Sequence, residues 1–237
     1  MRNKIIQCEQ WLRDEVAKAG ASGIILGLSG GIDSSVLAAL ALESLGRDKV
    51  LGVIMPCHSI AQDEQDARLL AESLGVNFMR VDLSEVFDVL CGGINLELNS
   101  LVKSNMKARL RMVTLYAIAQ SKNLLVCGTS NKSEYETGYF TKFGDSGSDL
   151  MPLANFLKRD IREMAKILCV PEKIIDKAPS AGLYEGQTDE NDMGFTYETL
   201  DEYLATGKIL DEKAKERIDV MRRRSEHKRK PIPIFKF

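Results

Sequence analysis

The chain has 237 residues, 44% of them hydrophobic and 28% charged, and its formal net charge is −2 at pH 7. These values are ordinary for one globular domain, and they give no bulk attraction to nucleic acid or to an anionic membrane. No apolar run approaches the roughly 20 residues of a membrane span, and the N-terminal segment lacks the apolar core of a signal peptide.

Apolar strands and amphipathic helices alternate along the first 168 residues. This alternation predicts an α/β fold, a three-layer α/β/α doubly wound parallel sheet of about five strands with C-terminal helices, in a single domain over 1–237. The loops at the carboxyl ends of the strands are where such sheets bind ligands. The expected strands are 23–28, 50–55, 76–81, 124–127 and 149–153, and the expected helices are 3–18, 34–45, 62–74, 84–89, 103–120 and 158–168.

The most informative segment is GLSGGIDSS at 27–35, between an expected strand and an expected helix. A tight glycine turn at a helix N-terminus directs backbone N–H groups and the positive end of the helix dipole to one point, which suits a phosphate group. No lysine follows Gly31 as in a Walker A loop, and the dinucleotide pattern of three spaced glycines is absent. A plain turn capped by Ser34 is the alternative, but it leaves Asp33 unexplained. An acid beside a phosphate is unfavourable unless a cation such as Mg²⁺ lies between them.

The segment SGGIDS at 29–34 resembles the signature of the PP-loop ATP pyrophosphatases, which implies an enzyme that splits ATP between its α- and β-phosphates. Together with it, KARLRM at 107–112, GTSNKSE at 128–134, GYFTKFGD at 138–145 and EHKR at 226–229 resemble the ammonia-dependent NAD synthetases. The implied reaction is the last step of NAD biosynthesis. The carboxylate of deamido-NAD attacks the α-phosphorus of ATP, giving an adenylate and pyrophosphate, and ammonia then displaces AMP and leaves NAD.

The resemblance also implies how ATP and Mg²⁺ are held. Asp33 and Glu134 would bind Mg²⁺ from opposite sides, with a solvated loop acid as the alternative for Glu134. Lys158 would be catalytic and would contact the phosphates; a cation at a helix start gains nothing from the helix dipole, which favours a functional explanation. The expected ATP-binding residues are Gly27, Leu28, Ser29, Gly30, Gly31, Ile32, Asp33, Ser34, Thr129, Lys158 and Ser180.

Further residues are assigned to the other two substrates by the same resemblance. Asp145 would be catalytic by deprotonating or orienting ammonium, with a loop cap as its alternative role. Arg111 lies two residues from Arg109, so we expect it on another helix face, toward solvent or a partner chain. The expected deamido-NAD contacts are Arg109, Lys142, Asp149, His227 and Lys228.

Two loops are expected to complete the site. The segment 179–194, with Gly182, Gly186 and Gly194, is interpreted as a loop that closes over the substrates, because water would hydrolyse the adenylate. Gly182 stands where the family usually has an acid, and Asp189 is a candidate replacement. His58, after the strand at 50–55, would stack on adenine or lie in an exposed loop.

The expected partners are small molecules and a second copy of the chain. The resemblance implies a homodimer with the deamido-NAD site across the interface, and the helix at 103–120 is the candidate contact. Five scattered cysteines favour reduced thiols in a cytoplasmic protein. The basic run at 222–230 suggests a nucleic-acid tail, but the acidic chain and the EHKR match favour a dinucleotide. We expect free ammonia as the nitrogen source, since 237 residues leave no room for a nitrilase-like domain.

Other functions are less well supported by the residues. A tRNA thiolase or a lysidine-type ligase usually carries Cys-x-x-Cys pairs or a basic nucleic-acid domain, and a GMP synthetase carries a C-terminal dimerisation domain, none of which is seen. A nucleotide sensor on the same fold would have no need of Asp33, Glu134 and Lys158 together.

Overall fold

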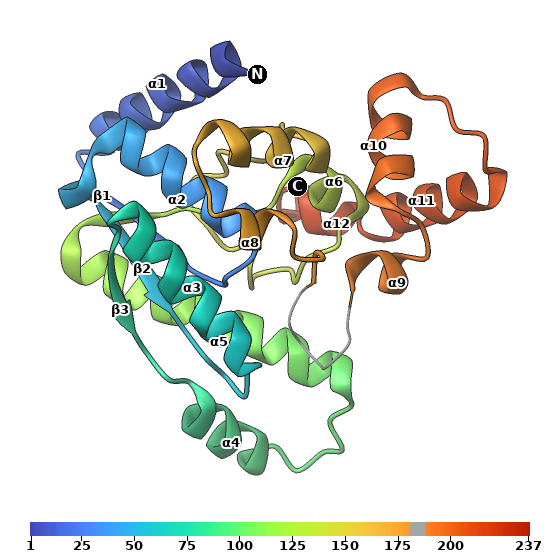
Figure 1. Ribbon diagram of the computed structural model, residues 1–237. Helices are drawn as coiled ribbons and strands as arrows, with labels where there is room; N and C mark the ends of the chain where they lie inside the picture. The colour runs from blue at the N-terminus through green and yellow to red at the C-terminus, as the bar shows by residue number, and fades with distance from the viewer. Residues whose placement is uncertain (181–187) are drawn as a thin grey trace.

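The computed structural model describes residues 1–180 and 188–237, and a four-stranded parallel sheet lies at its centre (Figure 1). The strand order is β3-β2-β1-β4, and β1 pairs with both neighbours, so that Ile25 is opposite Leu51 on one side and Val126 on the other. The chain therefore runs outward from β1 to β3 and then returns to the other side of β1. The strands are β1 (Gly23–Gly27), β2 (Val50–Ile54), β3 (Asn77–Arg80) and β4 (Leu124–Val126).

Helices cover both faces of this sheet, as the sequence predicts, and the ends of the expected helices move by no more than about one turn. Several short helices in the second half of the chain are additional to those expected. The helices of the described residues are α1 (Arg2–Lys18), α2 (Ile32–Leu45), α3 (Ala61–Leu74), α4 (Ser84–Gly93), α5 (Ser100–Lys122), α6 (Lys132–Thr137), α7 (Lys158–Ile167), α8 (Glu172–Ile175), α9 (Asp189–Met193), α10 (Tyr197–Thr206), α11 (Glu212–Arg224) and α12 (Glu226–Arg229).

The expected fifth strand at 149–153 is reduced to one parallel bridge between Cys127 and Leu150. Two residues stop the pairing there. Asp149 takes the Val126 N–H with its own carboxylate at 2.8 Å, and Pro152 has no N–H to extend a ladder. The described part of the chain therefore has four strands where about five were expected.

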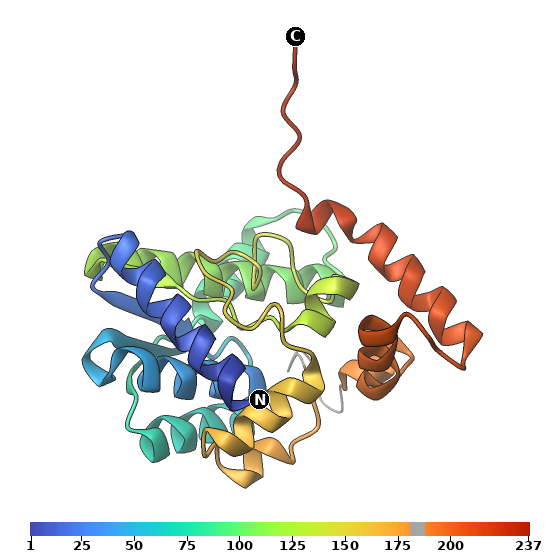
Figure 2. The same ribbon diagram turned by 90° about the horizontal axis from the view of Figure 1, so that it is seen from above.

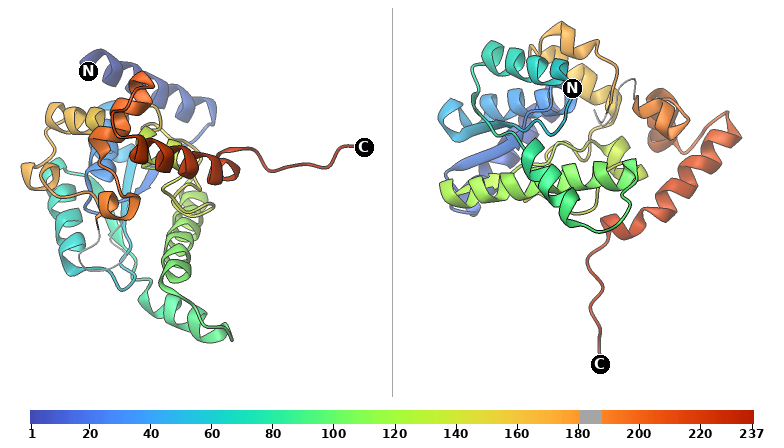
Figure 3. Two further views of the ribbon diagram at one scale, coloured as in Figure 1. Left: turned by 90° about the vertical axis from the view of Figure 1, so that its right-hand side faces the viewer. Right: turned by 90° about the horizontal axis from the view of Figure 1, so that it is seen from below.

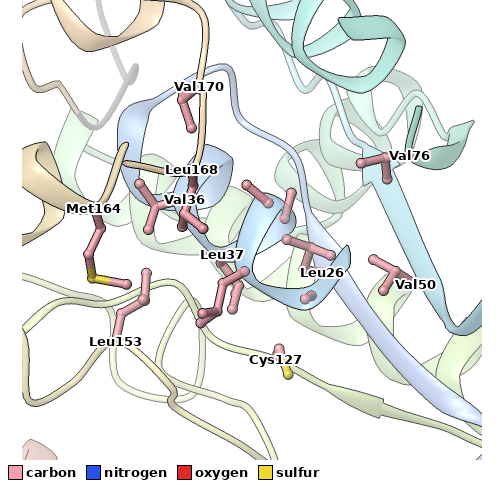
Figure 4. Close-up of a cluster of buried hydrophobic side chains, with 14 of the residues drawn as sticks. Leu26, Val36, Leu37, Val50, Val76, Cys127, Leu153, Met164, Leu168 and Val170 are labelled. Carbon is pink, nitrogen blue, oxygen red and sulfur yellow. The ribbon is translucent and has the colours of Figure 1, made fainter. Parts of the chain in front are cut away.

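Side-chain alternation along β1 separates two cores. Ile24 and Leu26 pack with α1, α2 and α7 on one face, whereas Ile25 packs with α4 and α5 on the other. Figure 4 shows Val36 and Leu37 of α2 between the strands and Met164 of α7. A third, smaller core joins α9, α10 and α11 beside the sheet domain (Figure 3).

After α12 the chain is extended and leaves the body of the molecule (Figure 2). In the part that the structure describes, no helix combines the length and the apolar character that crossing a membrane requires.

Gly30 combines a left-handed backbone conformation with a close backbone neighbour, so it has no room for a side chain. Its φ is +76°, and a Cβ there would lie 2.5 Å from the carbonyl oxygen of Asp63. Gly20 has a similar φ of +63°, but nothing lies within 4 Å of its Cβ position. We expect Gly20→Ala to cost about 1–2 kcal/mol of unfolding free energy, and Gly30→Ala to cost more because the loop must also move. Thermal unfolding of both variants checks this, and equal losses would contradict it.

Candidate active site

A cavity of about 600 Å³ opens beyond the carboxyl ends of β1, β2 and β4. The sheet order changes direction between β1 and β4, and this is where doubly wound sheets place their ligands. Five expected site residues are not part of its lining: Gly30, Arg109, Lys142, Asp149 and His227. The expected residues that do line it are Gly27, Leu28, Ser29, Gly31, Ile32, Asp33, Ser34, Thr129, Glu134, Asp145, Lys158, Ser180 and Lys228.

The glycine turn between β1 and α2 is held in shape by its own serines. The Ser29 N–H donates to Ser34 Oγ at 3.3 Å, and the Gly31 N–H donates to Ser29 Oγ at 3.2 Å. Ser34 and Ser35 both return a hydrogen bond to the Gly31 carbonyl, at 3.0 and 2.8 Å. The turn thus presents the N-terminus of a 14-residue helix to the cavity, which is favourable for a phosphate.

Lys158 lies between the two carboxylates that the sequence assigns to Mg²⁺. Its Nζ is 2.6 Å from Asp33 Oδ2 and 3.1 Å from Glu134 Oε1, and its side chain is only 2% exposed. Asn131 donates through Nδ2 to the other oxygen of Asp33 at 2.8 Å. Three segments far apart in the sequence therefore meet at one buried ion cluster, and Glu134 is not a solvated loop acid.

The sequence around Glu134 explains its orientation. Asn131 and Glu134 form a capping box at the start of α6: Asn131 Oδ1 accepts from the Glu134 N–H at 3.0 Å, and Glu134 Oε2 accepts from the Asn131 N–H at 3.3 Å. The Lys158 N–H, at the start of α7, donates to Ser133 Oγ at 3.0 Å. The Asn-x-x-Glu spacing is a helix-start signal, and it could have located α6 from the sequence.

Burial perturbs the charges of the cluster. Desolvation raises the pKa of Glu134 to about 7, with Lys158 acting against this shift and Asp33 adding to it. Burial alone would lower the pKa of Lys158, but Asp33 and Glu134 raise it above its ordinary value. Lys158 is therefore a positively charged group inside the protein at neutral pH.

The donor set fits Mg²⁺ only with help from other ligands. Asp33 and Glu134 supply hard carboxylate oxygens, which this ion prefers, and they are close enough together to share one cation, Lys158. Among residues 1–180 and 188–237, no group of three or more His, Cys, Asp or Glu side chains is arranged to hold a metal. Mg²⁺ would then take its remaining ligands from water and from phosphate oxygens.

Arg111 corrects one expectation from the sequence. It turns inward: its guanidinium donates to the Met55 carbonyl and to Ser59 Oγ, both at 3.1 Å, and it lines the cavity. Burial lowers its pKa. Arg111 thus ties α5 to the loop after β2. It does lie on a different helix face from Arg109, as the two-residue spacing predicts, but that face is the one toward the cavity.

Four of the five expected deamido-NAD residues lie near one another and are called the outer group: Arg109, Lys142, His227 and Lys228. Arg109 donates to the Lys142 carbonyl at 3.3 Å, and Lys142 Nζ donates to the His227 carbonyl at 2.7 Å. Lys228 Nζ reaches inward to the carbonyls of Gly138 and Phe140, at 2.7 and 2.6 Å. Asp149 lies apart, where its oxygens accept from Val126 and from the Tyr116 hydroxyl.

Asp145 makes the contact of a loop cap, and His58 lies in an exposed loop, which are the alternative roles that the sequence leaves open for them. Asp145 lines the cavity, and its Oδ1 accepts from the Thr141 N–H at 2.8 Å as a loop cap does. His58 is an exposed loop residue paired with Asp88 at 2.8 Å, and it is not part of the cavity lining. Gly182 and Gly186 lie outside the described residues.

Several lining residues were missed by the sequence analysis. Lys177 Nζ donates to Asp63 and Asp66, at 2.8 and 2.7 Å, and so fixes the segment that leads to Ser180 against α3. Asp189, which the sequence offers as a replacement for the loop acid, was not missed, and it lines the cavity together with Glu134 and Lys158. These contacts join residues more than 100 positions apart or depend on buried ion pairing, which local sequence patterns do not record.

The cavity at the switch point, the glycine turn at a helix N-terminus and the buried lysine–carboxylate cluster are features of a phosphate-binding enzyme of the parallel α/β class. A family model described as NAD synthase matches residues 4–232. The chain belongs to the NAD synthase family.

Relatives and solved structures agree with this assignment. The chain is 52% identical over 228 residues to the NH(3)-dependent NAD(+) synthetase of Finegoldia magna, covering 96% of this chain and 93% of the relative. It is 41% identical to a solved structure described as NMN synthetase from Francisella tularensis, with a TM-score of 0.95 and coverage of 100% and 98%. The NH3-dependent NAD synthetase of Campylobacter jejuni superposes with a TM-score of 0.83 at 28% identity, over 99% and 98% of the two chains.

Proposed function

We propose that the enzyme amidates deamido-NAD with ammonia at the expense of ATP, giving NAD, AMP and pyrophosphate through an adenylate. The observation that carries the proposal is the charged Lys158 at the start of α7, buried between Asp33 of the glycine turn and Glu134. A carboxylate is a poor acyl donor, and it must meet an anionic phosphate to be activated. Positive charge from the α2 N-terminus and the ammonium of Lys158, with Mg²⁺ on the two carboxylates, would lower the barrier to this step.

The turn residues and Lys158 would hold the phosphates of ATP. The α2 N-terminus would receive the phosphates, and Thr129 and Ser180 line the same cavity from the loops that follow β4 and α8. Mg²⁺ held by Asp33 and Glu134 would neutralise phosphate charge there. Lys158 would keep its proton throughout, because the neighbouring carboxylates favour its charged form.

The second step would use the part of the cavity near Asp145. Ammonium is a small cation, and the Asp145 carboxylate would hold it beside the adenylate while one oxygen stays bonded to the Thr141 N–H. Arg109, Lys142, His227 and Lys228 would contact the dinucleotide, whereas Asp149 would act on it by holding the loop after β4 in place.

Amidation of nicotinic acid mononucleotide is the second candidate, and one observation favours it. The solved structure described as an NMN synthetase superposes on the whole chain with a TM-score of 0.95. The chemistry at the carboxylate is the same for both acceptors. They differ in the adenylate half, which a mononucleotide lacks.

Steady-state kinetics with both acceptors tests the two candidates. The purified chain is supplied with ATP, Mg²⁺, ammonium and either deamido-NAD or nicotinic acid mononucleotide, and amide product and pyrophosphate are measured. We expect the larger kcat/KM with deamido-NAD. A larger value with the mononucleotide would select the second candidate, and no amide from either would overturn both.

The proposal includes a cytoplasmic homodimer formed from a single domain over 1–237, with the outer group of deamido-NAD residues near the interface. Two observations support it: the five cysteines are free thiols, and α5 carries exposed apolar residues such as Leu101 and Val113. Sedimentation equilibrium should give twice the mass of the chain. A monomer at micromolar concentration would overturn the dimer.

A further inference from the structure

Helices α9 and α10 belong to a core of their own, yet they send two side chains into the active site. Their apolar residues pack with α11 in the third core, away from the sheet (Figure 3). Tyr197, the first residue of α10, and Asp189, the first residue of α9, are 1% and 5% exposed. Burying a phenol and a carboxylate is unfavourable unless both are hydrogen-bonded, so their partners matter.

The Tyr197 hydroxyl lies among the charged groups of the site. It donates to Asp189 Oδ2 at 2.9 Å and lies 3.4 Å from Glu134 Oε1. A phenol has one proton, and the shorter contact to Asp189 is its better hydrogen bond. The ring centroid of Tyr197 is 4.9 Å from Lys158 Nζ, within range of a cation–π contact. Lys158 therefore has carboxylates on two sides and an aromatic face on a third.

A second side chain of α10 anchors the helix to the same place. Asp201 is 1% exposed, and its carboxylate accepts from the Ser133 hydroxyl and, at 2.8 Å, from the Arg159 N–H. These donors belong to α6 and α7, the helices that carry Glu134 and Lys158. Helix α10 thus fixes both helices of the ion cluster as well as touching their side chains.

We propose that Tyr197 is a positioning residue, whose hydroxyl, acting through Asp189, holds the ammonium of Lys158 in its reactive place and joins the C-terminal helices to the chemistry. The inference rests on the proposed function for its kinetic consequence. A lysine has four rotatable bonds, and ion pairs alone leave it free to follow either carboxylate. An aromatic wall locked by a hydrogen bond removes that freedom, and such pre-organisation is what a charge-stabilising group requires.

Tyr197→Phe isolates the hydroxyl, because it keeps the ring and its contact with Lys158. Tyr203→Phe is the matched control: Tyr203 is on the same helix, and its hydroxyl donates to Asp219 Oδ1 at 2.9 Å outside the cavity. We expect Tyr197→Phe to lower kcat by about tenfold with KM for ATP changed by less than about twofold, because a misplaced lysine affects the transition state most. Tyr203→Phe should keep kcat within about twofold of the wild type. An unchanged kcat in Tyr197→Phe would overturn the proposal.

Asp189→Asn shows whether the hydroxyl acts through Asp189. If it does, Tyr197→Phe should reduce kcat much less in the Asp189→Asn background than in the wild type. Additive losses would overturn this route. The wild type, the two single variants and the double variant are also compared by thermal unfolding, which does not depend on turnover. Non-additive shifts of the melting temperature would support coupling between Tyr197 and Asp189, and additive shifts would overturn it. If the wild type forms neither amide product, the proposed function is overturned, but the melting temperatures still test the coupling between Tyr197 and Asp189.

Discussion

Replacing Lys158 by methionine should lower pyrophosphate release by about 10³-fold, the largest single loss we expect. Lys158 is the buried cation nearest to both carboxylates, and methionine matches its length without its charge. Lys166→Met is the matched control, because Lys166 is an exposed residue of the same helix. Turnover is followed by pyrophosphate release at saturating ATP, and a Lys158→Met enzyme within about tenfold of the wild type would contradict the role.

The same substitution should also make stability depend more strongly on pH. The folded-state pKa of Glu134 is about 7, above its ordinary value of 4.5, so the fold favours the protonated form. Stability from this group is therefore present at low pH and is lost as the pH rises through that range. Without Lys158, which opposes the shift, the loss is larger and extends above pH 7.

Thermal unfolding without added metal measures this effect. Compared with the wild type, Lys158→Met should lose more in melting temperature at pH 8 than at pH 5.5, because two uncompensated carboxylates are then buried together. Equal losses of melting temperature at the two pH values would show that Lys158 does not stabilise the charged form of Glu134.

The layered fold could be predicted because its signals are local. Short apolar runs between amphipathic helices located each strand of the sheet, and the turn at 27–35 placed the cavity at the end of β1. The strand expected at 149–153 does not form because the carboxylate of Asp149 accepts the backbone N–H of Val126, a donor that pairing with β4 would need. An apolar pattern does not record such competition for a donor.

The candidate site also has residues that sequence motifs predicted and contacts that they did not. Asp33, Glu134 and Lys158 were named from motifs, and the structure brings them together. Their arrangement was not predictable, since Lys158 occupies the place between the carboxylates that the sequence analysis gave to a metal ion. Tyr197 and Arg111 were missed or misplaced because their importance comes from contacts across the fold, Tyr197 with Asp189 and Arg111 with Met55.

The second large effect is expected from Asp33→Asn, which should reduce pyrophosphate release by about 10²- to 10³-fold. Asparagine keeps the size of the side chain, and its carbonyl can still accept from Asn131 as Asp33 Oδ1 does at 2.8 Å. Its amide nitrogen, however, would face the ammonium of Lys158, which now sits 2.6 Å from a carboxylate oxygen. The fold should survive, while the charge that balances Lys158 and would bind Mg²⁺ is lost.

Measuring Glu134→Gln, alone and combined with Asp33→Asn, shows whether the two carboxylates act as one unit or independently. Groups that act as a unit lose nearly everything with the first substitution, so the double variant should be little slower than either single variant. Losses that multiply would mean that the two carboxylates act separately. Near-full turnover of Asp33→Asn at saturating Mg²⁺ would remove Asp33 from the chemistry. If the two carboxylates hold one Mg²⁺ together, both single variants should also need more Mg²⁺ for half-maximal rate.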